Sequence, residues 1–155
     1  MRGVFAFMLL GGALPLHANA EPLRFVPFTD QFLAIEIPAA ATQSEADSFQ
    51  VAFGARRASF ELSWSTPHVN ERTVDCGANA ATYRISRPSI YAYSCLMDGN
   101  VVYHVEKFGR TYRIGASDAT ETVELNMTYP ADQRAFWDPI VTHMSRTLRV
   151  QAQKR

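Results

Sequence analysis

Residues 122–148 read TVELNMTYPADQRAFWDPIVTHMSRTL, and the two halves of this stretch repeat their apolar side chains with different periods. In the first half every second residue is apolar, at Val123, Leu125, Met127 and Tyr129. Because successive side chains of a strand point to opposite faces, this half predicts a strand with one dry face and one wet face.

The second half repeats its apolar residues every three to four positions, as one side of a helix does. These residues are Phe136, Trp137, Ile140, Val141, Met144 and Leu148. Proline is tolerated in the first turn of a helix and bends it elsewhere, so Pro139 leaves two alternatives for the helix start. The helix either begins at Asp138, as its cap, or continues from Asp132 with a bend. In both cases its apolar stripe is expected to cover the dry face of the strand.

Alternating residues also precede this stretch, most clearly in 57–64, where Ala58, Phe60, Leu62 and Trp64 share one face. Gly54-Ala55, Arg87-Pro88 and Asp98-Gly99 provide turns, and Asp-Gly is a strong hairpin signal. The other expected strands are a short edge segment at 21–28, then 32–37, 48–53, 81–86, 89–97, 100–108 and 111–117, with 39–47 as a loop or one turn of helix and 117–121 as a turn. Hairpins followed by one helix predict an α+β fold, an antiparallel meander sheet packed against a C-terminal helix.

Residues 1–20 have the pattern of an export signal. Met1-Arg2 is a short positive start, 3–16 is an apolar run, and Ala18 and Ala20 match the small residues that signal peptidase requires. Cleavage after Ala20 would leave 21–155 as a single periplasmic or secreted domain. The alternative is an uncleaved anchor, but the run is shorter than the roughly 20 residues that span a bilayer. We expect no membrane span in 21–155.

The charge balance bears on the kind of partner. Lys and Arg number 15, Asp and Glu also number 15, and the formal net charge is zero. Nucleic-acid binding depends on neutralising phosphates, so a neutral chain without basic runs argues against that partner.

Cys76 and Cys95 are the two cysteines of the chain. An even pair in an exported protein predicts a disulfide. A metal pair and a redox pair are the alternatives, but the spacing is not C-x-x-C and no histidine is close to either cysteine in sequence. Cys76 lies in 66–80, which has no period and predicts a crossing loop with room for a short helix around 68–74. The disulfide would tie this loop to the strand that holds Cys95.

The order of these elements resembles the PsbP-like fold, which includes the DcrB-like group of small exported bacterial proteins. The resemblance is carried by the I-x-I-P that ends at Pro38, by Tyr129-Pro130 closing the last strand, and by the helix pattern F-W-D-P-I-V-x-x-M-S-x-T-L. It covers 21–155 as a pattern of elements and is specific over 123–148. It implies a non-enzymatic accessory or binding protein, with no catalytic residues to transfer, and we expect no cofactor.

His104 and Glu106 form the clearest candidate for chemistry. Both are expected on the same face of the strand 100–108, about 7 Å apart. Such a pair suits metal binding or acid–base catalysis, but a metal site needs a third ligand, and the neighbouring sequence has no second H-x-E or H-x-H. The alternative is that both side chains lie on a solvated sheet face. No G-x-S-x-G is present, so no nucleophile elbow is predicted.

The wet face of the sheet is the broader candidate site. If the strands align, it collects mixed charges and an amide, namely Arg57, Glu61, His104, Glu106, Arg113, Glu124 and Asn126. Mixed charge beside tyrosines suits a protein partner or a small polar ligand, although an ordinary solvated or covered face has the same composition.

From these patterns we predict a non-enzymatic periplasmic binding or accessory protein. It would act through the wet face or through the loop before Cys76, with an immunity or inhibitor protein as one subtype. The alternative prediction is a small metal-assisted hydrolase centred on His104 and Glu106.

Overall fold

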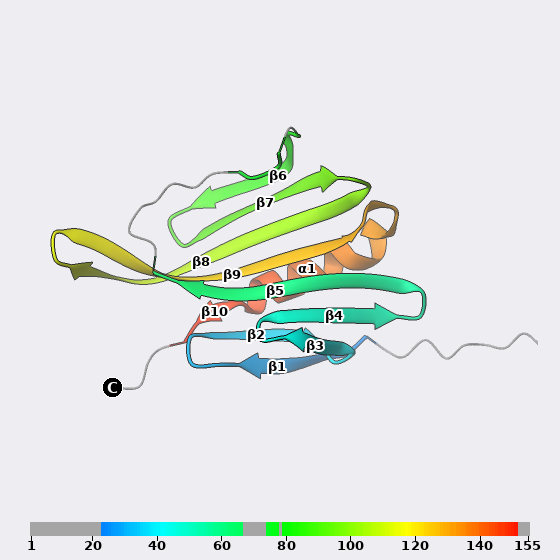
Figure 1. Ribbon diagram of the computed structural model, residues 1–155, viewed down its shortest axis with the longest axis horizontal. Coiled ribbons are helices and arrows are strands. Elements are labelled where there is room, and N and C mark those ends of the chain that lie inside the picture. Colours follow the sequence, from blue (N-terminus) through cyan, green and yellow to red (C-terminus); the bar gives the residue numbers. More distant parts are fainter. Residues whose placement is uncertain (1–22, 67–73, 78, 152–155) are drawn as a thin grey trace, which may run out of the picture.

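The computed structural model describes residues 23–66, 74–77 and 79–151. These residues form ten strands, one 3₁₀ turn and one α-helix (Figure 1). The elements are β1 Phe25–Thr29, β2 Leu33–Pro38, β3 Ala41–Glu45, β4 Ser48–Phe53, β5 Arg56–Ser65, β6 Ala81–Arg87, β7 Ile90–Met97, β8 Asn100–Ile114, β9 Ser117–Pro130, the 3₁₀ turn Ala131–Gln133, α1 Arg134–Thr147 and β10 Arg149–Val150. The predicted signal, residues 1–20, lies outside the described residues.

The strands form two antiparallel sheets. The larger has seven strands in the order β3-β4-β5-β9-β8-β7-β6, and the smaller has the order β1-β2-β10. The fold is therefore mostly antiparallel β with one C-terminal helix, as the α+β prediction requires. A single meander was too simple, because β10 returns after the helix and pairs Arg149 and Val150 with Ala34 and Leu33 of β2.

The small sheet is attached to α1 by polar contacts as well as apolar ones. The hydroxyl of Thr147 accepts a hydrogen bond from the backbone N–H of Glu36 at 3.0 Å. His143 is half-buried: its Nε2–H donates to Glu36 at 2.7 Å, and its ring stacks on Phe25 with centroids 3.9 Å apart. These contacts fix the helix between the two sheets.

The main hydrophobic core lies between the large sheet, α1 and the small sheet. The dry face of β9 is fully buried, and so are the helix residues that cover it: Val123, Leu125, Met127, Tyr129, Trp137, Ile140 and Met144 are each at most 2% exposed. The predicted packing of strand 122–129 against the helix is confirmed.

The helix begins at Arg134 and runs through Pro139, so the alternative start at Asp138 is wrong. Asp138 caps nothing. Its carboxylate accepts a hydrogen bond from the Tyr129 hydroxyl at 2.7 Å and pairs with Arg134 at 3.4 Å. Proline has no backbone N–H, so the carbonyl four residues before Pro139 lacks its helical hydrogen bond. Because Pro139 is exposed, water can bind that carbonyl instead.

Residues 39–47 were expected to form a loop or a turn of helix, but they contain β3, which pairs with β4 at the edge of the large sheet. Residues 42–45 are all exposed. A strand that buries neither face shows no alternation, so the pattern rule could not detect it. The predicted hairpin between β4 and β5 is confirmed. The predicted Asp98-Gly99 turn is also confirmed, and φ is positive at both residues, 50° at Asp98 and 77° at Gly99.

The predicted strands 100–108 and 111–117 are joined in one strand, β8, which ends at Ile114, and β9 begins at Ser117 rather than after a turn at 117–121. A bulge between Phe108 and Thr111 keeps β8 paired with β9 past Gly109. A Cβ at Gly109 would lie 2.9 Å from both γ-carbons of Val150, so glycine allows β10 to approach there. The turn is at Gly115-Ala116, and the hairpin projects beyond its neighbours (Figure 1).

None of the helices formed by the described residues is long and apolar enough to cross a membrane.

The core generates a stability prediction. Leu125 is fully buried at the centre of β9, so Leu125→Ala should lower the free energy of unfolding by about 2–5 kcal/mol through lost transfer energy and a residual cavity. Urea denaturation measures this loss. Gln50→Ala, at an exposed position of β4, is the control and should change stability by less than about 0.5 kcal/mol. Equal losses in the two variants would contradict this account of the core.

Candidate functional site

The face of the large sheet opposite α1 carries the predicted polar residues, and we call it the polar face. Strand register places Glu61, Asn126 and His104 in one row across β5, β9 and β8. The next row holds Ser63, Glu124 and Glu106. Five of the predicted residues, Glu61, His104, Glu106, Glu124 and Asn126, are therefore neighbours.

Arg57 and Arg113 lie apart from this group. The Arg57 guanidinium donates to the backbone oxygen of Gly54 at 2.8 Å, at the β4–β5 turn. Arg113 is exposed opposite Asp118, near the tip of the β8–β9 hairpin. Both were grouped with the others because side-chain alternation predicts which face of the sheet a residue lies on. It does not predict how neighbouring strands align, and therefore which residues of that face are close together.

His104 is buried, at 9% exposure, and each of its ring nitrogens has a partner. Nδ1 lies 2.6 Å from Oδ1 of Asn126, and Nε2 lies 2.9 Å from Oε1 of Glu106. In the imidazolium form both nitrogens donate, to the amide oxygen and to the carboxylate. A metal ion would have to displace one of these partners. Among the described residues, no three His, Cys, Asp or Glu side chains are arranged to hold a metal.

The charges around His104 favour its protonated form. Burial alone lowers the pKa of His104, but the hydrogen bonds to Glu106 and Asn126, with the charges of Glu106 and Glu124, outweigh burial and raise it above its ordinary value. Glu106 and Glu124 are direct cross-strand partners, an arrangement that is repulsive for like charges. The imidazolium offsets this repulsion at Glu106, while the hydroxyls of Ser63 and Ser65 donate to Glu124 at 3.2 and 3.4 Å.

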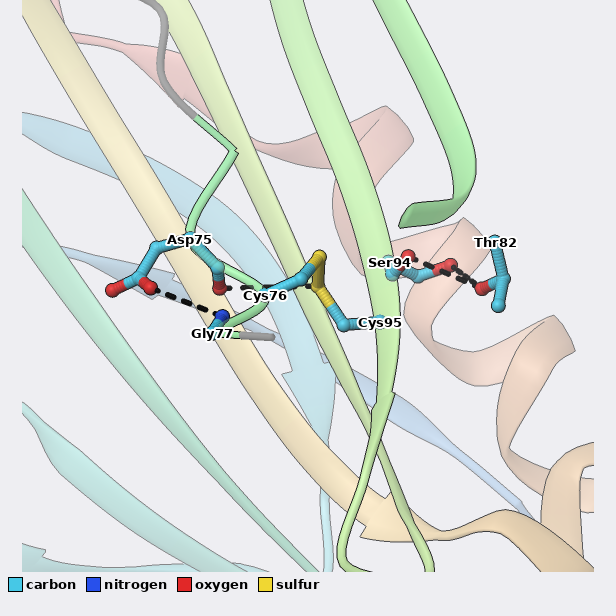
Figure 2. Close-up of a disulfide and its surroundings, with 6 residues drawn as sticks. All are labelled: Asp75, Cys76, Gly77, Thr82, Ser94 and Cys95. Carbon is cyan, nitrogen blue, oxygen red and sulfur yellow. Dashed lines mark hydrogen bonds between the residues drawn. A yellow bond between two sulfur atoms is a disulfide. The ribbon is translucent and has the colours of Figure 1, made fainter. Parts of the chain in front are cut away.

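Residues 74–77, which we call the Cys76 loop, lie on the same face. Cys76 and Cys95 form a disulfide with their Cα atoms 5.6 Å apart, as predicted. Figure 2 shows Asp75, Cys76 and Gly77 beside β7, with Cys76 joined to the strand at Cys95. The predicted short helix around 68–74 falls mainly outside the described residues. A disulfide of this kind is typical of a protein that folds outside the cytoplasm.

A second apolar cluster forms beneath this loop. It contains the disulfide, Tyr91 and Tyr93, with Val74 and Phe108 packed against it. The ring of Tyr93 lies 4.9 Å from that of His104. Burial raises the pKa of the Tyr93 hydroxyl, so this residue stays neutral at physiological pH. The solvated-face alternative is wrong for His104, which is buried, whereas Glu106, Glu124 and Asn126 are half-buried. Glu61 remains exposed.

The opposite face contains a groove that the sequence analysis missed. In Figure 1, α1 lies behind the middle strands of the large sheet, and β6 and β7 lie to one side of it. Between α1 and strands β6–β8 there is a groove of about 570 Å³. It is lined by Tyr83, Ile85, Arg87, Ile90, Ser94, Tyr103, Tyr129, Arg134, Asp138, Val141, Thr142, Ser145 and Arg146. We call this hollow the helix groove.

Hydroxyl groups and charges are placed among the apolar walls of the helix groove. The Tyr129 hydroxyl donates to Asp138, and the Tyr103 hydroxyl lies 3.5 Å from Oγ of Ser145. Burial raises the pKa of both tyrosines, and the Asp138 carboxylate raises that of Tyr129 further. Both hydroxyls therefore remain protonated donors. One signal in the sequence could have indicated the groove: Tyr83 and Ile85 alternate on β6, yet the chain predicts only one helix to cover the sheet.

A second hollow, of about 740 Å³, adjoins the helix groove and shares Ile90 and Arg146 with it. Its other lining residues are Ser89, Lys107, Phe108, Gly109, Thr147, Leu148, Arg149 and Val150. The Lys107 ammonium donates to the backbone oxygen of Arg146 at 3.2 Å, and burial lowers its pKa. Basic residues therefore gather where the two hollows meet.

Comparison with known proteins assigns no family. No protein-family model matches the chain, and no curated protein matches its sequence. Among similar solved structures is LpqN, described as involved in cell envelope biogenesis of Mycobacterium tuberculosis. It is 10% identical to this chain, with a TM-score of 0.45 over 85% of this chain and 93% of LpqN. A likeness this distant assigns no residue or ligand, and the PsbP-like resemblance stays a prediction.

The disulfide should contribute measurable stability. The paired cysteines are 19 positions apart, and closing a loop of this size stabilises a fold by about 3 kcal/mol in the chain-entropy model. We expect the double variant Cys76→Ala/Cys95→Ala to lose about that much in urea denaturation. Peptide mapping without reductant should recover Cys76 and Cys95 in one linked species. Two free thiols in the exported protein would contradict the structure.

The His104 cluster should make stability depend on pH. Because the folded pKa is raised, the contribution of His104 is complete below its unfolded pKa of about 6.5 and is lost as pH rises through the folded value. His104→Gln should therefore cost more stability at about pH 5.5 than at about pH 9, measured by urea denaturation against wild type. His143→Gln, at a half-exposed ring, controls for the loss of an imidazole. Equal costs of His104→Gln at both pH values would exclude this role.

Proposed function

We propose that this chain is a non-enzymatic binding protein of the periplasm or another extracytoplasmic compartment, and that it takes a small ligand into the helix groove. The disulfide and the export pattern of residues 1–20 support the compartment. The groove supports the binding role, because its volume of about 570 Å³ is within the usual range of small-molecule sites.

The groove combines the two features that a binding site needs. Ile85, Ile90 and Val141 provide apolar contact area, while the hydroxyls of Tyr103 and Tyr129, held by Ser145 and Asp138, provide neutral polar groups at fixed positions. Its described lining has no histidine or cysteine, and its one carboxylate, Asp138, is already held by Tyr129 and Arg134. This composition favours binding over acid–base or nucleophilic chemistry.

The other predictions from the sequence receive less support. A metal-assisted hydrolase at His104 and Glu106 stays a prediction, and both ring nitrogens of His104 are already engaged. An immunity or inhibitor protein acting through the polar face or the Cys76 loop also stays a prediction. The exposed part of the polar face, around Glu61, is where such a partner would make contact.

A neutral fluorescent probe, N-phenyl-1-naphthylamine, tests for an apolar site independently of ligand identity. We expect saturable binding with one probe per chain. Thr142→Trp should weaken it by about tenfold or more, because Thr142 is an exposed residue of the groove wall and the larger ring would occupy the groove.

Ala135→Trp is the matched control. Ala135 is an exposed residue of the same helix and does not line the groove, so this variant should bind the probe like wild type. The proposal fails if the probe shows no saturable binding, or if Thr142→Trp binds it as tightly as Ala135→Trp does.

A further inference from the structure

Charged and apolar side chains are unevenly distributed along the helix groove, and this distribution indicates a class of ligand. The inference rests on the proposed function. We infer that its ligand is a single-chain anionic lipid. The phosphate or carboxylate head would bind at the junction of the two hollows, near Arg146. The apolar chain would lie along the helix groove.

The first observation is the charge of the lining. The two hollows together are lined by Arg87, Lys107, Arg134, Arg146 and Arg149, against a single acidic residue, Asp138. The whole chain has equal numbers of basic and acidic residues, so this excess arises from their placement on the fold. A concave surface with one sign of charge attracts ligands of the opposite sign.

The second observation is that this charge is unevenly distributed along the helix. At one end of the groove Arg134 pairs with Asp138 at 3.4 Å, and Tyr129 donates to the same carboxylate, so the charges there largely cancel. At the other end Arg146 adjoins Ile90, close to Lys107, without an acidic residue in the lining. The excess of basic over acidic side chains therefore lies at the junction, where an anionic head would bind.

The third observation is the apolar path between these ends. Tyr83 is 43% exposed although its ring is large, and it stacks on Tyr103 with ring centroids 6.4 Å apart. Ile85 and Val141 complete the path along the walls of the groove. Covering these side chains with an alkyl chain would remove apolar area from water, which favours an amphiphile over a free anion.

Displacement of N-phenyl-1-naphthylamine separates the head from the chain. The competitors are dodecyl phosphate and dodecyl maltoside, both below the concentrations at which they form micelles, and binding of inorganic phosphate is followed by calorimetry. We expect dodecyl phosphate to bind at least tenfold more tightly than dodecyl maltoside, the scale of one charge-assisted hydrogen bond. Inorganic phosphate should bind far more weakly than either.

Arg146→Gln should weaken dodecyl phosphate by about tenfold and leave dodecyl maltoside unchanged, which also shows that the variant is folded. Arg24→Gln, at an exposed arginine outside both hollows, is the matched control and should change neither affinity. Thr142→Trp should weaken both competitors.

The outcomes distinguish this inference from the proposed function. Equal affinities for the two dodecyl compounds, or an equal effect of Arg146→Gln on both, would overturn the anionic head while the groove remained a binding site. Tight binding of inorganic phosphate alone would overturn the lipid. Undiminished binding of dodecyl phosphate to Thr142→Trp would place the lipid elsewhere. Failure of the probe itself to bind saturably would instead remove the proposed function.

Discussion

The arrangement of the molecule depends on a mismatch between the width of its large sheet and the size of its single helix. Seven strands spaced by about 4.8 Å span roughly 29 Å, whereas a helix with its side chains is about 10–12 Å wide. α1 therefore covers the centre of the sheet, where Leu125 and Met127 meet Ile140 and Met144. The small sheet extends the cover toward one side. The strands at the other side, β6 and β7, keep part of their dry face open to the helix groove.

Sequence patterns predicted the elements that have one apolar, buried face and one polar face. Strand 122–129, the helix stripe and the Asp98-Gly99 turn belong to this class, and the cysteine pair followed from compartment chemistry. β3 escaped prediction because its side chains are almost all exposed, and the bulge after Phe108 escaped because it changes the register without changing the composition. The small sheet could not be predicted, since its third strand is the two residues of β10.

The candidate site likewise has a part that could be predicted from the sequence and a part that could not. Alternation placed His104 with Glu106 and, through alignment, with Glu124 and Asn126, but it could not predict that His104 is buried. Its ring packs against Tyr93 and Tyr91 of the neighbouring strand, and a pattern rule does not predict which strands become neighbours. The helix groove is harder still to predict, because it results from strands that no element covers. A pattern rule assigns a face to each residue and assumes that each apolar face is filled.

The irregular edge strand β3 also affects how copies of the molecule meet. An open sheet ends in unpaired backbone N–H and C=O groups, and a regular edge invites pairing with a second sheet. The pairing of β3 with β4 shifts between Gln43 and Glu45, and residues 42–45 are exposed and polar. At the opposite edge, β6 shifts its register between Ala81 and Tyr83. Both edges therefore discourage edge-to-edge aggregation, which would otherwise be a hazard for a chain that is mostly strand and carries no net charge to keep its copies apart.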